Sequence, residues 1–212
     1  MIYEFPEKTE PIRQGDIFVG IPKPEIELSQ GLPIIDEDQN IETVPWMEVA
    51  ADEQPITVVL AVQPVTAIVL TQDCDARRAA DITLCQIRDF FDVERGVSKE
   101  TTPKKLIGKI VSQSKVNLKW FYLPPNNRIG FSERMAVDLL TTLRVAREDL
   151  QSLIPLRRGR LNAVAEDHFR ERVAYFFRRY AYDEWYPFGK DEIEYYPNYA
   201  TLEPSDLFPW QR

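Results

Sequence analysis

The chain has 212 residues, 44% of them hydrophobic and 28% charged, a balance that favours a packed core over general disorder. Its formal net charge of −8 argues against a general nucleic-acid binder, because affinity for phosphates comes mainly from Lys and Arg. No apolar run approaches the roughly 20 residues that span a bilayer, and the N-terminus shows no secretory signal. The two cysteines, Cys74 and Cys85, are too few for a disulfide framework and favour a cytoplasmic protein.

Short extended segments separated by proline are predicted for the first part of the chain. Residues 14–22 read as a turn and a strand that stops at Pro22. The β-branched run 56–62 is typical of a strand, and residues 65–70 form a second apolar run after the break at Pro64. Two strands separated by a proline turn predict a hairpin or a corner.

Strands and helices alternate in the second part. Alternating residues 82–87, the aromatic run 119–123 and residues 135–145 predict strands. Residues 101–111 predict a short helix, and apolar residues at helical spacing predict a long helix over about 162–182. The expected fold is therefore α+β: a bent, mainly antiparallel sheet or small SH3-like barrel with a long C-terminal helix.

Two regions are expected from this pattern. Residues 1–150 would form the β-rich, barrel-like domain. Residues 151–212 would supply the C-terminal helix and an acidic aromatic tail, which has too many aromatic residues for plain disorder. We expect the tail to pack on the same domain or on a partner.

A polar segment follows the buried strand 67–70 and marks the candidate site. Strand ends position side chains while the turn exposes them, so ligands often bind there. The proposed catalytic residues are Thr71, Asp73 and Arg77, with Gln72, Cys74, Asp75 and Arg78 as binding residues. The alternative is a turn in which Asp73 and Asp75 accept backbone N–H bonds and Cys74 is a small buried filler.

Cysteine or metal chemistry has weaker support. The only histidine, His168, would have to pack against Cys74 to form a dyad, and no Cys-x-x-Cys pair suggests zinc. Gly-rich phosphate loops, Gly-x-Ser-x-Gly and His-Glu-x-x-His are all missing from the sequence, which therefore predicts no cofactor and no metal.

Arginines are concentrated between residues 157 and 179. Arg170 and Arg178 are candidate phosphate-binding residues, because guanidinium groups bind phosphates in bidentate fashion. Interleaved Glu166, Asp167 and Glu171 offer the alternative of ion pairs within the helix.

Two fragments resemble the MazF/PemK-type toxin family. Gly15-Asp16-Ile17 is similar to its opening strand, and residues 63–71 are similar to its Arg-Pro-x-x-Val-x-Ser/Thr strand, with Gln63 in place of the family's Arg. The resemblance implies an SH3-like barrel and single-strand RNA cleavage. It covers about a third of the chain, and it supports the barrel more than the activity, because fold does not imply function.

Two functions follow as hypotheses. The first is a protein-binding or regulatory module of a bacterial multi-component system, such as a defence or toxin–antitoxin system, with another protein as partner. The second is a metal-independent endoribonuclease with RNA as substrate, in which Arg77 stabilises the pentavalent phosphate and Asp73 is the base.

Overall fold

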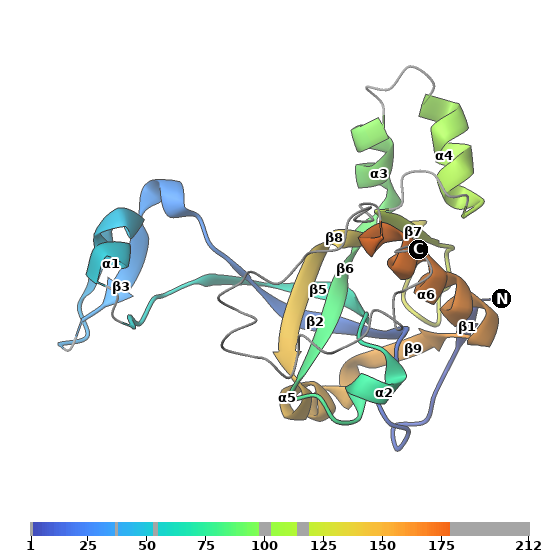
Figure 1. Ribbon diagram of the computed structural model, residues 1–212, viewed down its shortest axis with the longest axis horizontal. Coiled ribbons are helices and arrows are strands. Elements are labelled where there is room, and N and C mark those ends of the chain that lie inside the picture. The colour runs from blue at the N-terminus through green and yellow to red at the C-terminus, as the bar shows by residue number, and fades with distance from the viewer. Residues whose placement is uncertain (1, 37, 53–54, 98–102, 114–118, 179–212) are drawn as a thin grey trace, which may run out of the picture. The chain divides into compact units, whose positions relative to one another are not determined.

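The computed structural model describes residues 2–178 except 37, 53–54, 98–102 and 114–118 (Figure 1). Within these residues, seven antiparallel strands form a sheet that curls into a half-barrel, accompanied by six α-helices. The predicted α+β class is confirmed, including a helix near the C-terminal end of the described chain.

The strands of the large sheet lie in the order β1–β9–β2–β5–β6–β8–β7. Their bounds are Tyr3–Glu4 for β1, Asp16–Glu25 for β2, Ala61–Val69 for β5, Asp81–Asp89 for β6, Trp120–Leu123 for β7, Met135–Ala146 for β8 and Arg157–Leu161 for β9. A separate two-stranded sheet contains β3, Leu32–Ile35, and β4, Ile41–Val44. The helices are α1, Trp46–Asp52; α2, Asp73–Ala76; α3, Phe90–Val97; α4, Pro103–Val111; α5, Arg147–Ser152; and α6, Ala163–Phe177, with 3₁₀ turns η1, Leu28–Gln30, and η2, Ile154–Leu156.

The chain divides into two compact units, Met1–Arg172 and Val173–Arg212. The first unit contains both sheets. In the second, the rings of Phe176 and Phe177 meet edge to face at 5.1 Å, and the Arg178 N–H donates to the carbonyl of Ala174. The predicted aromatic tail lies outside the described residues.

Both faces of the large sheet are covered, which follows from apolar residues at successive positions of its strands. On one face, Phe18 and Ala67 belong to a buried cluster with Leu150 of α5 and Ile154 of η2. Because successive strand residues point to opposite faces, Ile17 and Ile68 lie on the other, and both are fully buried. The α6 residue Phe169 meets Phe121 of β7 edge to face at 5.1 Å.

The prolines do not end the strands as the sequence predicted. Strand β2 continues through Pro22, and strand β5 continues through Pro64. The two prolines face each other across the β2–β5 pair, which we call the ribbon. The expected stop at Pro22 and the hairpin or corner at Pro64 are therefore wrong, and the strand predicted at 56–62 is replaced by a single strand that begins at Ala61. Strand β9 pairs with β2 only as far as Phe18, and β6 pairs with β5 only from Ala67 onward. At the two prolines no further strand of the described chain pairs with either side of the β2–β5 ribbon. The missing N–H groups of the prolines therefore remove no hydrogen bond between strands.

A buried ion cluster joins the beginning of β2 to β9. The fully buried carboxylate of Asp16 accepts hydrogen bonds from Arg160 Nε at 2.5 Å, Arg157 Nη1 at 3.1 Å and the backbone N–H of Arg13 at 3.0 Å. Arg160 is itself 1% exposed and also contacts Glu10 at 3.2 Å. Gly15 precedes this aspartate at a φ of +84°, a conformation that favours glycine.

Replacing Asp16 by alanine is expected to destabilise the fold by about 3–5 kcal/mol, because two guanidinium groups would lose their buried counter-ion. Urea denaturation measures the loss. Asp75→Ala is the matched control: its exposed pair with Arg78 is worth about 1 kcal/mol at most. Equal effects of the two substitutions would contradict a stabilising role of the buried cluster.

Candidate functional site

The predicted site begins with Thr71, where β5 gives way to α2. Its hydroxyl accepts a hydrogen bond from the backbone N–H of Thr83 at 2.8 Å, and its own N–H donates to the carbonyl of Thr83 at 3.2 Å. Thr71 therefore ties the exit of β5 to β6.

Asp73 is held by the loop that precedes β2. One carboxylate oxygen accepts a hydrogen bond from Arg13 Nε at 2.7 Å, and the other accepts the backbone N–H of Gln14 at 2.8 Å. Both oxygens thus contact groups that lie about 60 residues earlier in the chain. The geometry gives Asp73 a structural partner on each oxygen.

Helix α6 extends this contact into an ionic chain, which we define as Asp73, Arg13, Glu166 and Arg170. Arg13 Nη2 lies 3.3 Å from Glu166 Oε2, and Arg170 Nη2 lies 2.5 Å from Glu166 Oε1. Gln14 supports it: its side-chain amide donates to the Leu70 carbonyl at 2.7 Å, and its oxygen accepts from Arg170 Nε at 3.3 Å. Carboxylates and guanidinium groups alternate along the ionic chain, so neighbouring charges attract.

Glu166 is the most deeply buried member of the ionic chain, with 5% of the residue exposed. Burial raises the pKa of its carboxyl, and the charge of Asp73 raises the pKa further, while Arg13 and Arg170 act in the opposite direction. The hydrogen bond to Asp73 raises the pKa of Arg13, which keeps this guanidinium charged.

The remaining predicted residues of this segment lie at the surface. Gln72, Cys74, Asp75, Arg77 and Arg78 are exposed on or beside α2. Arg78 pairs with Asp75 at 3.2 Å, and the Arg77 carbonyl accepts a hydrogen bond from Arg147.

The structure thus brings Asp73 and Arg170 together through Arg13 and Glu166. Arg178 belongs to the second compact unit. The catalytic roles of Thr71, Asp73 and Arg77 stay predictions.

The cysteines and the histidine lie in contrasting environments. Cys74 and His168 are exposed, and Cys85 is buried in β6. Burial raises the pKa of the Cys85 thiol to about 12, so this sulfur stays protonated at neutral pH. In the described ranges no group of three or more His, Cys, Asp or Glu residues is placed to hold a metal ion.

A second candidate site, absent from the predicted site residues, runs from the end of β2 to the start of β5. We call residues 24–63 the acidic arm. They contain nine Asp or Glu residues and no Lys or Arg. They also carry large exposed apolar side chains: Ile26, Leu28, Ile41, Trp46, Met47, Ile56, Val59 and Val62. The combination of exposed apolar groups with a single sign of charge could have been found by scanning charge along the sequence.

The acidic arm has its own small scaffold. Strands β3 and β4 pair with each other, and residues 57–59 run beside β3 through hydrogen bonds such as Val59 N–H to the Pro33 carbonyl at 2.8 Å. Leu32 and Val49 are its buried apolar residues. A hollow of about 580 Å³ lies beside β3, with Ile26, Leu32 and Val59 among its walls.

Comparison with known proteins gives no relative: no family model matches the chain, and no curated protein matches it. Among the described helices, none is long and apolar enough to cross a membrane.

The raised pKa of Glu166 predicts a pH-dependent stability term. Because the folded state holds this proton more tightly than the unfolded chain, the contribution is complete below the ordinary Glu pKa of about 4.3. It is lost as the pH rises through the folded pKa. Relative to Glu166→Gln, the wild-type protein should lose stability as the pH rises from about 4 to 7.

Urea denaturation of both proteins across this pH range measures the difference. Glu148→Gln, which removes an exposed carboxylate from helix α5, is the matched control. A wild-type protein that gains stability over Glu166→Gln with rising pH would show that the arginines outweigh burial.

Proposed function

We propose that this chain is a protein-binding module whose docking element is the acidic arm. The observation that carries the proposal is the gathering of exposed apolar side chains on a segment with no cation. Large apolar side chains that gather exposed on one segment mark a candidate interaction site.

The exposed side chains are of the kind that anchor protein interfaces. Trp46 and Met47 begin α1, and 78% of Met47 is exposed, although methionine usually fills cores. Aromatic residues and methionine are enriched at interfaces, where a few buried anchors supply most of the binding energy. Ile41 of the neighbouring strand β4 adds apolar surface and is 62% exposed.

The charge of the acidic arm defines the chemistry of the partner. Nine carboxylates without a base repel phosphates, which disfavours nucleic acid at this surface. A complementary protein surface has an apolar centre surrounded by Lys and Arg. Such a pairing accelerates association at low ionic strength and weakens when salt screens the charges.

The scaffold of the acidic arm separates binding from folding. Strands β3 and β4 pair outside the seven-stranded sheet, and Trp46, Met47 and Ile41 are exposed rather than part of the buried clusters. Substitutions at these positions are therefore expected to change affinity while the large sheet stays folded. This property makes the proposal testable by mutation.

Site-specific photo-crosslinking tests the proposal in cells. A photo-reactive amino acid at Met47 should give one discrete protein adduct, joined at an apolar segment flanked by Lys or Arg. The same group at Leu140, which is 60% exposed on β8, is the matched control and should not give this adduct. An equal adduct from both positions, or an adduct with nucleic acid, would contradict the proposal.

Affinity for the purified, crosslinked partner then measures the anchors. Trp46→Ala and Met47→Ala should each weaken binding about tenfold to thirtyfold, the range of interface hot spots. Glu42→Lys with Glu48→Lys should weaken it further and reduce its salt dependence.

A second copy of the chain is the competing occupant of the acidic arm. Residues 101–132 contain six Lys or Arg and no Asp or Glu, so the chain itself has a basic segment. An adduct between two copies of the chain, together with a sedimentation coefficient that rises with protein concentration, would show that the acidic arm binds a second copy and not a separate partner.

A further inference from the structure

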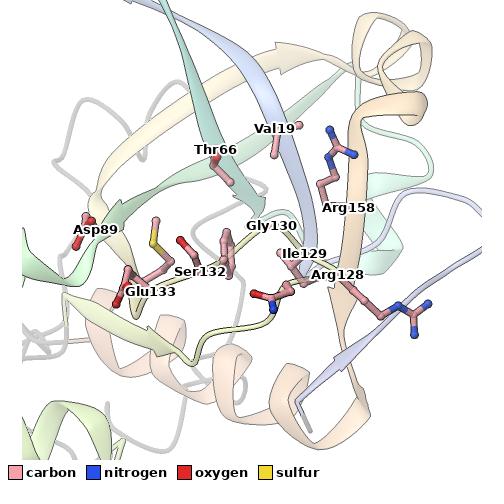
Figure 2. Close-up of a pocket in the computed structure, with 12 residues that line it drawn as sticks. Val19, Thr66, Asp89, Arg128, Ile129, Gly130, Ser132, Glu133 and Arg158 are labelled. Atoms are coloured by element: carbon pink, nitrogen blue, oxygen red, sulfur yellow. The ribbon is translucent and has the colours of Figure 1, made fainter.

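A cavity of about 610 Å³ opens on the large sheet where β5 leaves β6 (Figure 2). Its walls are Val19 of β2, Thr66 of β5, Met135 of β8, Arg158 of β9, Asp89 at the end of β6, and the loop 127–133. This volume is within the range of small-ligand sites in proteins. None of these residues belongs to the acidic arm or to the ionic chain.

The loop that forms one wall is fixed by its own hydrogen bonds. Asn126 and Phe131 exchange backbone hydrogen bonds of 2.8 and 3.0 Å, and the Asn126 side chain accepts the N–H of Arg128 at 2.9 Å. Ile129 is 1% exposed and packs on β9, where a Cβ on Gly159 would lie 2.3 Å from its Cδ1 atom. The wall is therefore formed before any ligand arrives.

Opposite charges stand at opposite sides of the cavity. Figure 2 shows Asp89 and Glu133 on one side and Arg158 and Arg128 on the other. Asp89 uses one oxygen to accept the N–H of Phe91 at 2.8 Å, and the Arg128 guanidinium lies 3.6 Å from the centre of the Phe5 ring.

Glu133 and Arg158 line the same cavity without forming a pair. Among the described residues neither has an ion-pair or side-chain hydrogen-bond partner. By contrast, the carboxylates and guanidinium groups of the ionic chain pair with each other. Two unpaired poles across a preformed hollow are arranged to meet opposite charges on one ligand.

The surface between the poles combines apolar and polar groups. Met135 is partly exposed and supplies apolar contact beside the buried Ile129 and Phe131, and Thr66 and Ser132 supply hydrogen-bonding groups. A ligand for this cavity therefore has a cation at one end, an apolar middle and an anion at the other end.

We propose that this cavity binds a short zwitterionic peptide of about three residues. Its ammonium group contacts Asp89 and Glu133, and its carboxylate contacts Arg158. A fully extended tripeptide spans about 10 Å. The carboxylate can accept two hydrogen bonds from one guanidinium, which makes Arg158 the specific anchor.

Titration with the tripeptide Ala-Leu-Ala tests the proposal by NMR on the full chain. At about pH 6.5 its amino group is charged, because the α-amino pKa is about 7.7–8.0. The backbone signals of Gly130 and Ser132 should shift. N-acetylation or C-amidation removes one charge each, and each is expected to weaken binding about tenfold.

Substitutions on the two sides separate the poles. Arg158→Gln should weaken binding of the free peptide about tenfold and abolish the further effect of C-amidation, while the effect of N-acetylation stays. Glu133→Gln should reduce the effect of N-acetylation and keep that of C-amidation. Both side chains are exposed, so the variants are expected to fold, which unchanged spectra elsewhere would verify.

Arg78→Gln, an exposed arginine on the α2 side, is the matched control and should leave every affinity unchanged. No shift of Gly130 or Ser132 at millimolar peptide would overturn the proposal. So would equal binding of the free and the capped peptides, or an amidation effect that persists in Arg158→Gln.

Discussion

The carboxylate of Asp16, buried against Arg160 and Arg157, is the contact on which the rest of the molecule depends. It joins the first long strand to the last strand of the sheet, across 144 residues of sequence. Three charges leave water at this point, and the cost is offset because Asp16 also accepts a backbone N–H while Arg160 also reaches Glu10. The contact fixes β2 against β9, its neighbour in the sheet.

The loop before Asp16 also contacts helices α2 and α6. Arg13 and Gln14 lie within three residues of Asp16, and both contact Asp73 at the start of α2. Arg13 also reaches Glu166 of α6. One loop therefore positions two helices that are about 90 residues apart in sequence. Asp73, in the polar segment that follows β5, accordingly stabilises the fold.

Both proposed binding surfaces depend on the separation of β5 from β6. The two strands pair only over residues 67–69 of β5, whereas the pairing of β5 with β2 continues to residue 61. Thr66, just beyond the last paired residue, lines the cavity. Beyond it the ribbon leads into the acidic arm, which has its own small sheet. A single divergence in the sheet thus provides a cavity wall and a connection to a separate interface.

Local sequence determined the α+β class, the approximate positions of β2 and β5–β8 and the C-terminal helix, because β-branched runs and helical periodicity act over a few residues. It also located the polar exit of β5. Tertiary structure alone decided that Asp73 binds Arg13, that Arg157 and Arg160 are buried with Asp16, and that Pro22 and Pro64 lie within strands. These outcomes depend on neighbours 40 to 150 residues away in the sequence. The hydrophobic periodicity of a local segment does not indicate which distant charges or strand edges will come into contact.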